Sequence, residues 1–460
     1  MTLRKALLLS GSIGLVVAAI LVIFGLITSA VEPAIAALCL VFFYMATTFK
    51  TLKFSALLMT GAALFAAVLY LGLDRDVGAL LQSAGRITYL PALIIVLSVF
   101  RAAAQNSPII NVAGRYIVNQ PPSRRYLLLT SGANVLCVLL NVGGFALLHE
   151  IGIRAVRQGK EKSQRLIEIQ DRRITRATLI GFSSTFFWSP FGLSLNLCLA
   201  FLPGTTWLGF APIGIAISIV FIAIGWLLDR LEKSSGNSAV PVAEKGGAKA
   251  LIGMLLMMVM LTGTAVLGEQ IFDIPLQAVI LIIIPLFAFL WAMSARFPEK
   301  GAFAEAGNLA VTAFRQLPSI ANEVAILTAA SCLGLLVAGL LPPEFVAQIM
   351  RLAEPSPSLL GAGIMVTIFA LAIVGINPMV PATAILTAAV STDVQISAHF
   401  LMAAIIIGWA ASMTISPTTA TIAIASSRLN KNPFRVGLGW NGPFGACVVA
   451  VGVLLMFLWV

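Results

Sequence analysis

The chain has 460 residues, of which 59% are hydrophobic and only 10% are charged, and its mean hydropathy is +1.01. A soluble domain carries about 25% charged residues, so this composition excludes a soluble globular protein and indicates an integral membrane protein. The formal net charge of +11 does not indicate nucleic-acid binding, because the basic residues lie in short loops between apolar runs, as the positive-inside rule expects.

In chain order, about eleven apolar runs reach the length of about 20 residues that a membrane span needs. The expected spans cover residues 6–28, 33–49, 54–73, 88–104, 177–203, 206–229, 250–268, 274–295, 318–341, 398–427 and 436–460. The first run is too long for the core of a signal peptide and lacks a clear cleavage site, so we expect a retained span. The cysteines lie inside apolar runs without metal-ligand spacing, which is typical of packing residues.

Two further apolar stretches, 126–153 and 358–391, contain helix breakers near their middles. The breakers read Asn141-Val142-Gly143-Gly144 in the first stretch and Gly375-Ile376-Asn377-Pro378 in the second. Each half is too short to cross about 30 Å of hydrocarbon. Each stretch is therefore either a re-entrant hairpin or a single kinked span.

The distribution of basic residues favours two hairpins. If the N-terminus is cytoplasmic and both stretches return to their side of entry, the 29 Lys and Arg residues fall on one face, except Arg75, Arg86 and Arg351. If either stretch crossed the membrane once, every later loop would change sides and the basic residues would no longer gather on one face. The first hairpin is then expected to enter from the cytoplasm and the second from outside, as an inverted repeat requires.

Two of the expected spans look like copies of each other. Residues 177–190 read ATLIGFSSTFFWSP and residues 404–417 read AIIIGWAASMTISP. Each copy starts as an apolar helix and ends in Ser-Pro, where proline removes a backbone donor and breaks the helix. Interrupted spans in corresponding halves of a membrane protein indicate the binding site of a transporter.

The predicted fold class is an all-α polytopic membrane protein with an inverted-topology repeat and with scaffold and transport domains. Its parts are N-terminal scaffold spans (1–87), a first repeat (88–229), a cytoplasmic linker (230–249), further scaffold spans (250–317) and a second repeat (318–460). The first repeat holds the hairpin 126–153 and the broken span 177–203; the second holds the hairpin 358–391 and the broken span 398–427. The charged run 159–176 is expected to be a cytoplasmic helix, and the C-terminus is expected outside.

This organisation resembles the ion transporter superfamily, and most closely the divalent anion–sodium symporter family. The resemblance covers nearly the whole chain and implies eleven spans, two opposed hairpins, two broken spans and a dimer. That family carries a Ser-Asn-Thr signature at each hairpin tip. Here Asn141 and Asn377 match the asparagine, whereas the flanking Ser and Thr are missing. The resemblance therefore implies the transport mechanism but not a dicarboxylate substrate.

The chemistry at the breaks points to an anion and a cation. Helix N-termini carry partial positive charge and bind carboxylates, and free carbonyls with Ser, Thr and Asn oxygens suit a hard cation such as sodium. We expect sodium at the Asn141 and Asn377 tips. The candidate binding residues are Asn141, Gly143, Gly144, Ser183, Ser184, Thr185, Ser189, Asn377, Pro378, Ser412, Thr414, Ser416, Thr418 and Thr419. The alternative is that these hydroxyls only bond the preceding helical turn.

Charged residues in spans are costly and often functional. Glu323 is a candidate proton or cation carboxylate, or a partner of Arg315 near the cytoplasmic surface. Arg101 is expected to extend to the cytoplasmic surface, which leaves the site without an Arg or Lys. A site of this kind favours a monoanion, or a dianion accompanied by more than one cation.

These features predict a secondary active transporter, a symporter that moves a small organic anion with sodium or protons by an elevator-type mechanism. The sequence shows no nucleotide-binding loop, zinc motif or nucleophile motif, so we expect no enzyme, no catalytic residue and no cofactor beyond the coupling ion. The expected partners are the anion, the lipid bilayer and a second copy of the chain, without nucleic acid, in a bacterial inner membrane. The alternatives are a cation/proton exchanger without organic substrate, a channel, and an intramembrane enzyme or lipid-modifying protein.

Overall fold

The computed structural model describes residues 3–105, 107–157, 163–232, 246–294, 301–342, 344, 348, 356–391 and 396–459. Every regular element in these ranges is helical. The first half contains α1 (Leu3–Thr28), α2 (Glu32–Thr48), α3 (Phe54–Gly72), α4 (Val77–Gln82), α5 (Ala84–Gln105), α6 (Pro108–Val118), α7 (Pro122–Leu140), α8 (Val142–Arg157), α9 (Gln164–Trp188), α10 (Leu193–Phe201) and α11 (Trp207–Leu231). The second half contains α12 (Gly247–Phe272), α13 (Leu276–Ser294), α14 (Ala302–Gln316), α15 (Ala321–Leu340), α17 (Pro357–Ile373), α18 (Met379–Ser391), α19 (Ala398–Ile415), α20 (Ala420–Leu429) and α21 (Trp440–Trp459).

The described residues include 10 helices that are long and apolar enough to cross a membrane. They correspond to the expected spans with one exception, the range 177–203. In that range α9 ends at Trp188 and is long enough, but its first half carries the charged run that ends at Arg176, and α10 has only 9 residues. The chain is thus an all-helical polytopic membrane protein, as the sequence predicts.

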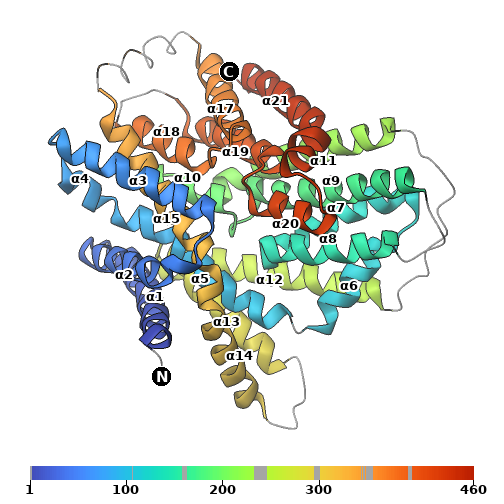
Figure 1. The fold of residues 1–460 in the computed structure, drawn as a ribbon, viewed down its shortest axis with the longest axis horizontal. Coiled ribbons are helices and arrows are strands. Elements are labelled where there is room, and N and C mark those ends of the chain that lie inside the picture. Colours follow the sequence, from blue (N-terminus) through green and yellow to red (C-terminus); the bar gives the residue numbers. More distant parts are fainter. Residues whose placement is uncertain are drawn as a thin grey trace.

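Burial separates central helices from peripheral ones. The most apolar part of the α4–α5 span and that of the α19–α20 span are each 83% buried, whereas those of α12 and α3 are 17% and 22% buried. Figure 1 accordingly shows α5 and α19 near the middle of the molecule. The outer helices expose large apolar side chains such as Phe65, Ile219 and Val259. Exposed apolar surface of this extent is what a lipid-facing helix requires.

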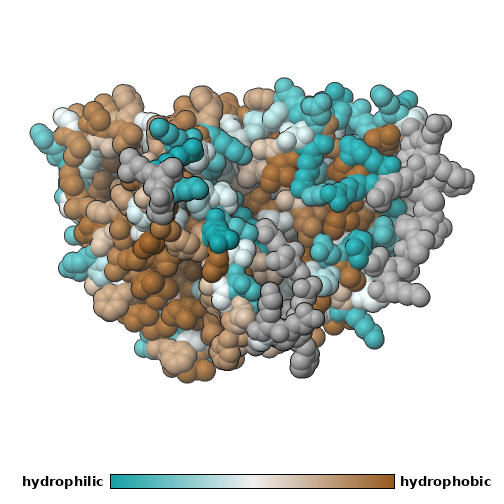
Figure 2. Space-filling view, turned by 60° about the horizontal axis from the view of Figure 1, so that its bottom comes forward, coloured by the Kyte–Doolittle hydropathy of each residue, from teal (hydrophilic) through white to brown (hydrophobic). Residues whose placement is uncertain are grey.

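The surface is divided between apolar and hydrophilic regions. In Figure 2, apolar residues cover much of the left and lower part of the visible face, and hydrophilic residues gather toward the upper right. A membrane protein needs this separation, because only its apolar surface can remain in contact with lipid chains.

The same order of elements occurs twice along the described chain. In the first half, α5 is followed by the helix pair α7–α8, the interrupted pair α9–α10 and α11. In the second half, α15 is followed by α17–α18, α19–α20 and α21. In each half the first arm of the helix pair packs closely on the interrupted helix, α7 on α9 and α17 on α19.

The charged segment before the first break is part of a single long helix. Ser163 caps α9 through its side chain, which accepts a hydrogen bond from the Leu166 N–H, and the helix then continues without interruption to Trp188. The sequence predicts a separate cytoplasmic helix over 159–176. Instead the charged residues form the first half of the broken helix itself, and residues 158–162 lie outside the described ranges.

Ion pairs connect the charged first half of α9 to α11 and to the segment that follows α20. The Arg173 guanidinium donates two hydrogen bonds to the Asp229 carboxylate of α11, at 2.7 and 2.6 Å. The Arg435 guanidinium, beyond α20, donates to Glu168 of α9 at 2.7 Å. Arg428 of α20 pairs with Glu150 of α8 at 2.9 Å. The second half of the chain is therefore held against the first hairpin and the first broken helix.

Candidate functional site

The break in α9 is a short extended segment held by hydrogen bonds. Ser189 leaves the helix with φ −68° and ψ 126°, and Pro190 prevents the helical hydrogen bond at that position. The Ser189 hydroxyl accepts a hydrogen bond from the Phe191 N–H at 3.2 Å. The Asn196 amide donates to the carbonyls of Pro190 and Gly192 at 2.5 and 2.9 Å. The backbone carbonyls that lose their helical partners at the break therefore find a hydrogen-bond donor in a side chain of α10.

The break in α19 has nearly the same geometry. Ser416 has φ −68° and ψ 124°, within a few degrees of its counterpart Ser189. The hydroxyls of Ser416 and Thr418 lie 3.0 Å apart, and Thr418 donates to the Gly375 carbonyl at 3.2 Å. This last bond joins the break to the turn between α17 and α18. Each interrupted helix thus ends beside the tip of its own hairpin.

A pair of matched glycines explains how each hairpin packs on its broken helix. A Cβ atom on Gly408 would lie 2.8 Å from the Met365 carbonyl oxygen of α17, and one on Gly181 would overlap the Thr130 carbonyl oxygen of α7. Only glycine permits such close backbone approach. The residues that the sequence matches between the copies therefore have the same structural role in both.

A small cavity lies at the tip of the first hairpin. Its volume is ≈ 10 Å³, about the space that one water molecule requires. Its polar lining comes from three residues that the sequence places in the site, Asn141, Thr185 and Ser189. Leu97 of α5 and Phe186 of α9 are among its apolar lining residues. The cavity accommodates a single small ion or water, and it is too small for an organic acid.

Several of the predicted site hydroxyls donate to the preceding helical turn. Ser184, Thr185, Ser412 and Thr414 donate to the carbonyls of Gly181, Phe182, Gly408 and Ala411, and Thr419 donates to the Ser416 carbonyl at the break itself. A hydroxyl that donates its proton in this way keeps oxygen lone pairs for another partner. Ser183 differs, because its buried hydroxyl has no hydrogen-bond partner among the described residues.

The two tip asparagines have different surroundings. Asn141 ends α7 with a positive φ of 52° and lines the cavity. Asn377 instead accepts a hydrogen bond from the Met379 N–H at 3.0 Å, at the beginning of α18. Pro378 beside it is buried. The structure therefore gives Asn377 a capping role and leaves Asn141 facing the cavity.

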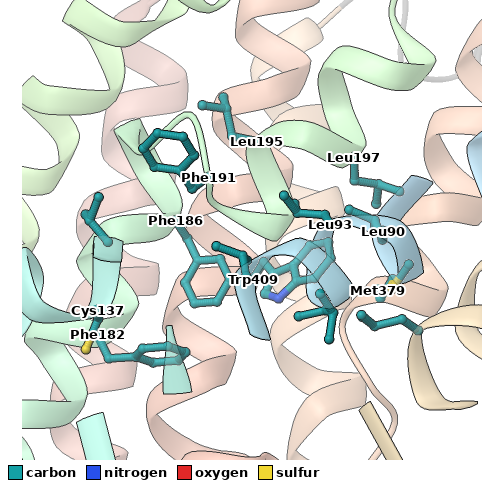
Figure 3. Packing of buried hydrophobic residues seen from close by; sticks show 14 of the residues in the cluster. Leu90, Leu93, Cys137, Phe182, Phe186, Phe191, Leu195, Leu197, Met379 and Trp409 are labelled. Carbon is teal, nitrogen blue, oxygen red and sulfur yellow. The ribbon is translucent and has the colours of Figure 1, made fainter. Parts of the chain in front are cut away.

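Packing rather than open space occupies the region between the two broken helices. Phe186 and Trp409 are each 3% exposed, and their ring centroids lie 6.3 Å apart. Figure 3 shows these two rings side by side, with Leu93 of α5 and Met379 of α18 nearby. The aromatic residues beside the breaks thus join the two halves of the site.

Sequence reasoning missed Arg101. A Cβ on Gly143 would lie 3.3 Å from the Arg101 Cδ, so the arginine contacts the first hairpin tip. Its Nη2 lies 3.5 Å from the Glu323 carboxylate of α15. The local sequence held no signal for this pair, because the two residues are far apart in the chain. The absence of a side chain at Gly143, a predicted site residue, is what admits Arg101.

Comparison with known proteins shows which solved structure has a similar fold. No protein-family model and no curated protein matches the sequence. The chain is similar to the YdaH transporter of Alcanivorax borkumensis, whose crystal structure is described as having an unusual topology. The TM-score is 0.56 at 15% identity, and the match covers 88% of this chain and 98% of that one. This chain therefore has the fold of a membrane transporter.

Proposed function

We propose that the chain is a secondary active transporter that moves a small organic anion with sodium or protons. The observation that carries the proposal is the first break, where Asn141, Thr185 and Ser189 line an ion-sized cavity beside the hairpin tip. The equivalent break in α19 has the same backbone dihedral angles to within a few degrees. Two matched, oxygen-rich interruptions of central helices are typical of secondary transporters.

The proposed coupling-ion site is the small cavity. Thr185 donates its proton to the Phe182 carbonyl at 2.7 Å, so its lone pairs remain available for a cation. Asn141 and Ser189 add an amide and a hydroxyl at the same place. Oxygen ligands of this kind suit a hard cation. The cavity volume limits the occupant to one small ion.

The proposed moving part consists of the two hairpins and the two broken helices. Contacts inside this part are direct: Arg428 of α20 pairs with Glu150 of α8 at 2.9 Å, and Phe186 of α9 packs on Trp409 of α19. These contacts support movement as one body against a scaffold that includes α1–α3 and α12–α13. Such an elevator-type mechanism carries the occupied site between the two faces of the membrane.

Three finer assignments belong to the same proposal. Membership of the divalent anion–sodium symporter family, a dimeric scaffold and location in a bacterial inner membrane are implied by the resemblance in organisation. The fold similarity to a transporter supports transport in general.

The function is tested with purified protein in two steps. A thermal-shift screen with lactate, gluconate, benzoate and succinate, with and without sodium, identifies a stabilising acid. Uptake of that acid into proteoliposomes is then measured under a sodium or a proton gradient. Accumulation against the acid's own gradient supports the proposal. Sodium/proton exchange without any acid favours the exchanger, and flux that only dissipates a gradient favours a channel.

A matched pair of variants tests the ion site. Thr185→Val removes one cavity oxygen at nearly constant volume. Thr178→Val removes a similarly bonded hydroxyl on the same helix, which donates to the Ile174 carbonyl at 2.8 Å and does not line the cavity. We expect Thr185→Val to raise the ion concentration for half-maximal uptake by about tenfold, and Thr178→Val to leave it unchanged.

A further inference from the structure

The side chain of Arg101 contacts the first hairpin tip. It lies in the last turns of α5, and its Cγ, Cδ and Nε atoms are the atoms nearest to a Cβ built on Gly143, at 3.3 to 3.4 Å. Leu97, one turn earlier on the same helix, lines the cavity with Asn141. Residues one turn apart lie on the same helix face. The arginine is therefore next to the proposed ion site and on the same side of α5.

The guanidinium is incompletely satisfied. Its Nη2 approaches the Glu323 carboxylate at 3.5 Å, but the geometry gives no hydrogen bond. The Nε and Nη2 atoms are shielded from solvent and have no hydrogen-bond partner among the described residues. A buried donor without a partner is costly. An arginine presents a planar fork of donors that matches the two oxygens of a carboxylate.

The local environment favours an anion at this fork. Val142 and Gly143 form the first turn of α8, which has 16 residues, and the first turn of a helix leaves N–H groups without intrahelical acceptors. Since Gly143 has no side chain, the Arg101 side chain lies directly against this turn, which holds the guanidinium and the first N–H groups of α8 close together. The side chain of Glu323, 31% exposed, can turn to water when it releases the arginine.

We propose that Arg101 binds the carboxylate of the transported anion, and that Glu323 holds the guanidinium while the site is empty. This inference rests on the proposed function and adds the residue that recognises the substrate's charge. The incoming carboxylate replaces Glu323 as the partner of Arg101. Arg101 lies on α5 and Glu323 lies on α15, and neither helix belongs to the proposed moving part. This exchange of partners therefore occurs at the contact between the first hairpin tip and these two helices.

The test compares carboxylates with neutral analogues. Purified protein is titrated with lactate, benzoate and succinate and with lactamide, benzamide and succinamide, and binding is followed by thermal shift and calorimetry. We expect acids to bind and amides to fail. Arg101→Gln is expected to weaken acid binding about tenfold or more, because a charged hydrogen-bonded pair is lost. Arg101→Lys keeps the charge but loses the fork, and it should bind with intermediate affinity.

Glu323→Gln gives the result that a merely structural pair would not produce. Removing the competing carboxylate should tighten acid binding several-fold, whereas loss of a structural ion pair would weaken it or lower the yield. Arg124→Gln is the control, because Arg124 is exposed at the beginning of α7. Folded yield is checked by size-exclusion chromatography for each variant.

The outcomes separate this inference from the proposed function. If the wild-type protein binds and transports an acid and Arg101→Gln binds it equally well, the role of Arg101 is overturned and the transport function stands. If Glu323→Gln binds the acid more weakly, the exchange of partners is overturned. If the wild-type protein neither binds nor transports any acid, the anion-transport function and the Arg101 inference are both overturned.

Discussion

Gly181 and Gly408 occupy equivalent places on the two broken helices, and each admits a backbone carbonyl of the adjacent hairpin arm. We expect Gly181→Ala to cost about 1–3 kcal/mol, because the new Cβ would overlap the Thr130 carbonyl oxygen and lie 2.6 Å from the Ala133 Cβ. Folded yield and thermal stability after purification measure the effect.

The control for this substitution is Gly253→Ala on α12, where a Cβ meets nothing within 4 Å. Alanine favours helix over glycine by about 1 kcal/mol, so the control should be at least as stable as the wild-type protein. Equal stability of both variants would show that α7 and α9 do not approach as closely as described.

The tip asparagines should respond differently to replacement by alanine. Asn377→Ala removes the acceptor of the Met379 N–H and should cost about 1 kcal/mol of stability, as loss of a helix cap does. Asn141→Ala removes a cavity oxygen, and we expect it to weaken ion-dependent uptake by about tenfold with little loss of folded protein. Uptake is normalised to the amount of folded transporter in the liposomes. Normal ion dependence in Asn141→Ala would show that Asn141 only turns the chain.

At the scale of elements, α9 is joined to α11 by the bidentate Arg173–Asp229 pair. Asp229 is 5% exposed, so water does not replace the lost partner well. Asp229→Asn should lower stability by about 1–3 kcal/mol. Asp273→Asn provides the control, because Asp273 is exposed at a helix end with a φ of 52° that asparagine tolerates. A comparable loss in both variants would exclude a specific role of the pair.

The orientation of the two hairpins is a prediction about how elements cross the membrane. Both hairpins consist of two helices joined by a short turn, α7–α8 and α17–α18. The positive-inside distribution predicts Gln158 in the cytoplasm and Ser391 outside. Gln158 lies outside the described residues, and Ser391 ends α18. Labelling single cysteines at these positions from each side of the membrane shows on which side each position lies. Labelling of both from the same side would rule out the inverted repeat.

At the scale of the whole molecule, the charge carried during transport follows from the composition of the site. Arg101 and Glu323 carry opposite charges and lie on α5 and α15, outside the proposed moving part, so together they add no net charge to the loaded site. A second buried negative charge on the substrate would remain uncompensated, at a cost of several kcal/mol. Transport of the loaded site should therefore be electroneutral or move net positive charge inward. Uptake into proteoliposomes at a clamped membrane potential measures this charge. Faster entry at an inside-positive potential would contradict it.

The sequence by itself determined the membrane class, ten of the expected spans and the two breaks. Length, hydropathy and proline chemistry are local properties, and they act without tertiary context. The match of Gly181 with Gly408 also came from local sequence, and it located the contacts between each hairpin and its broken helix.

Only the tertiary structure decided the partners of the charged residues and the role of each asparagine. Arg101 and Glu323 meet because α5 packs on α15, and no local pattern encodes the rotation that brings two distant helices face to face. The charged run before Ala177 forms the first half of α9, where Arg173 pairs with Asp229 of α11 and Glu168 accepts from Arg435, and these distant partners are not encoded in the local sequence. The filling of the centre by Phe186 and Trp409 likewise follows from packing between the two halves, which depends on the whole chain.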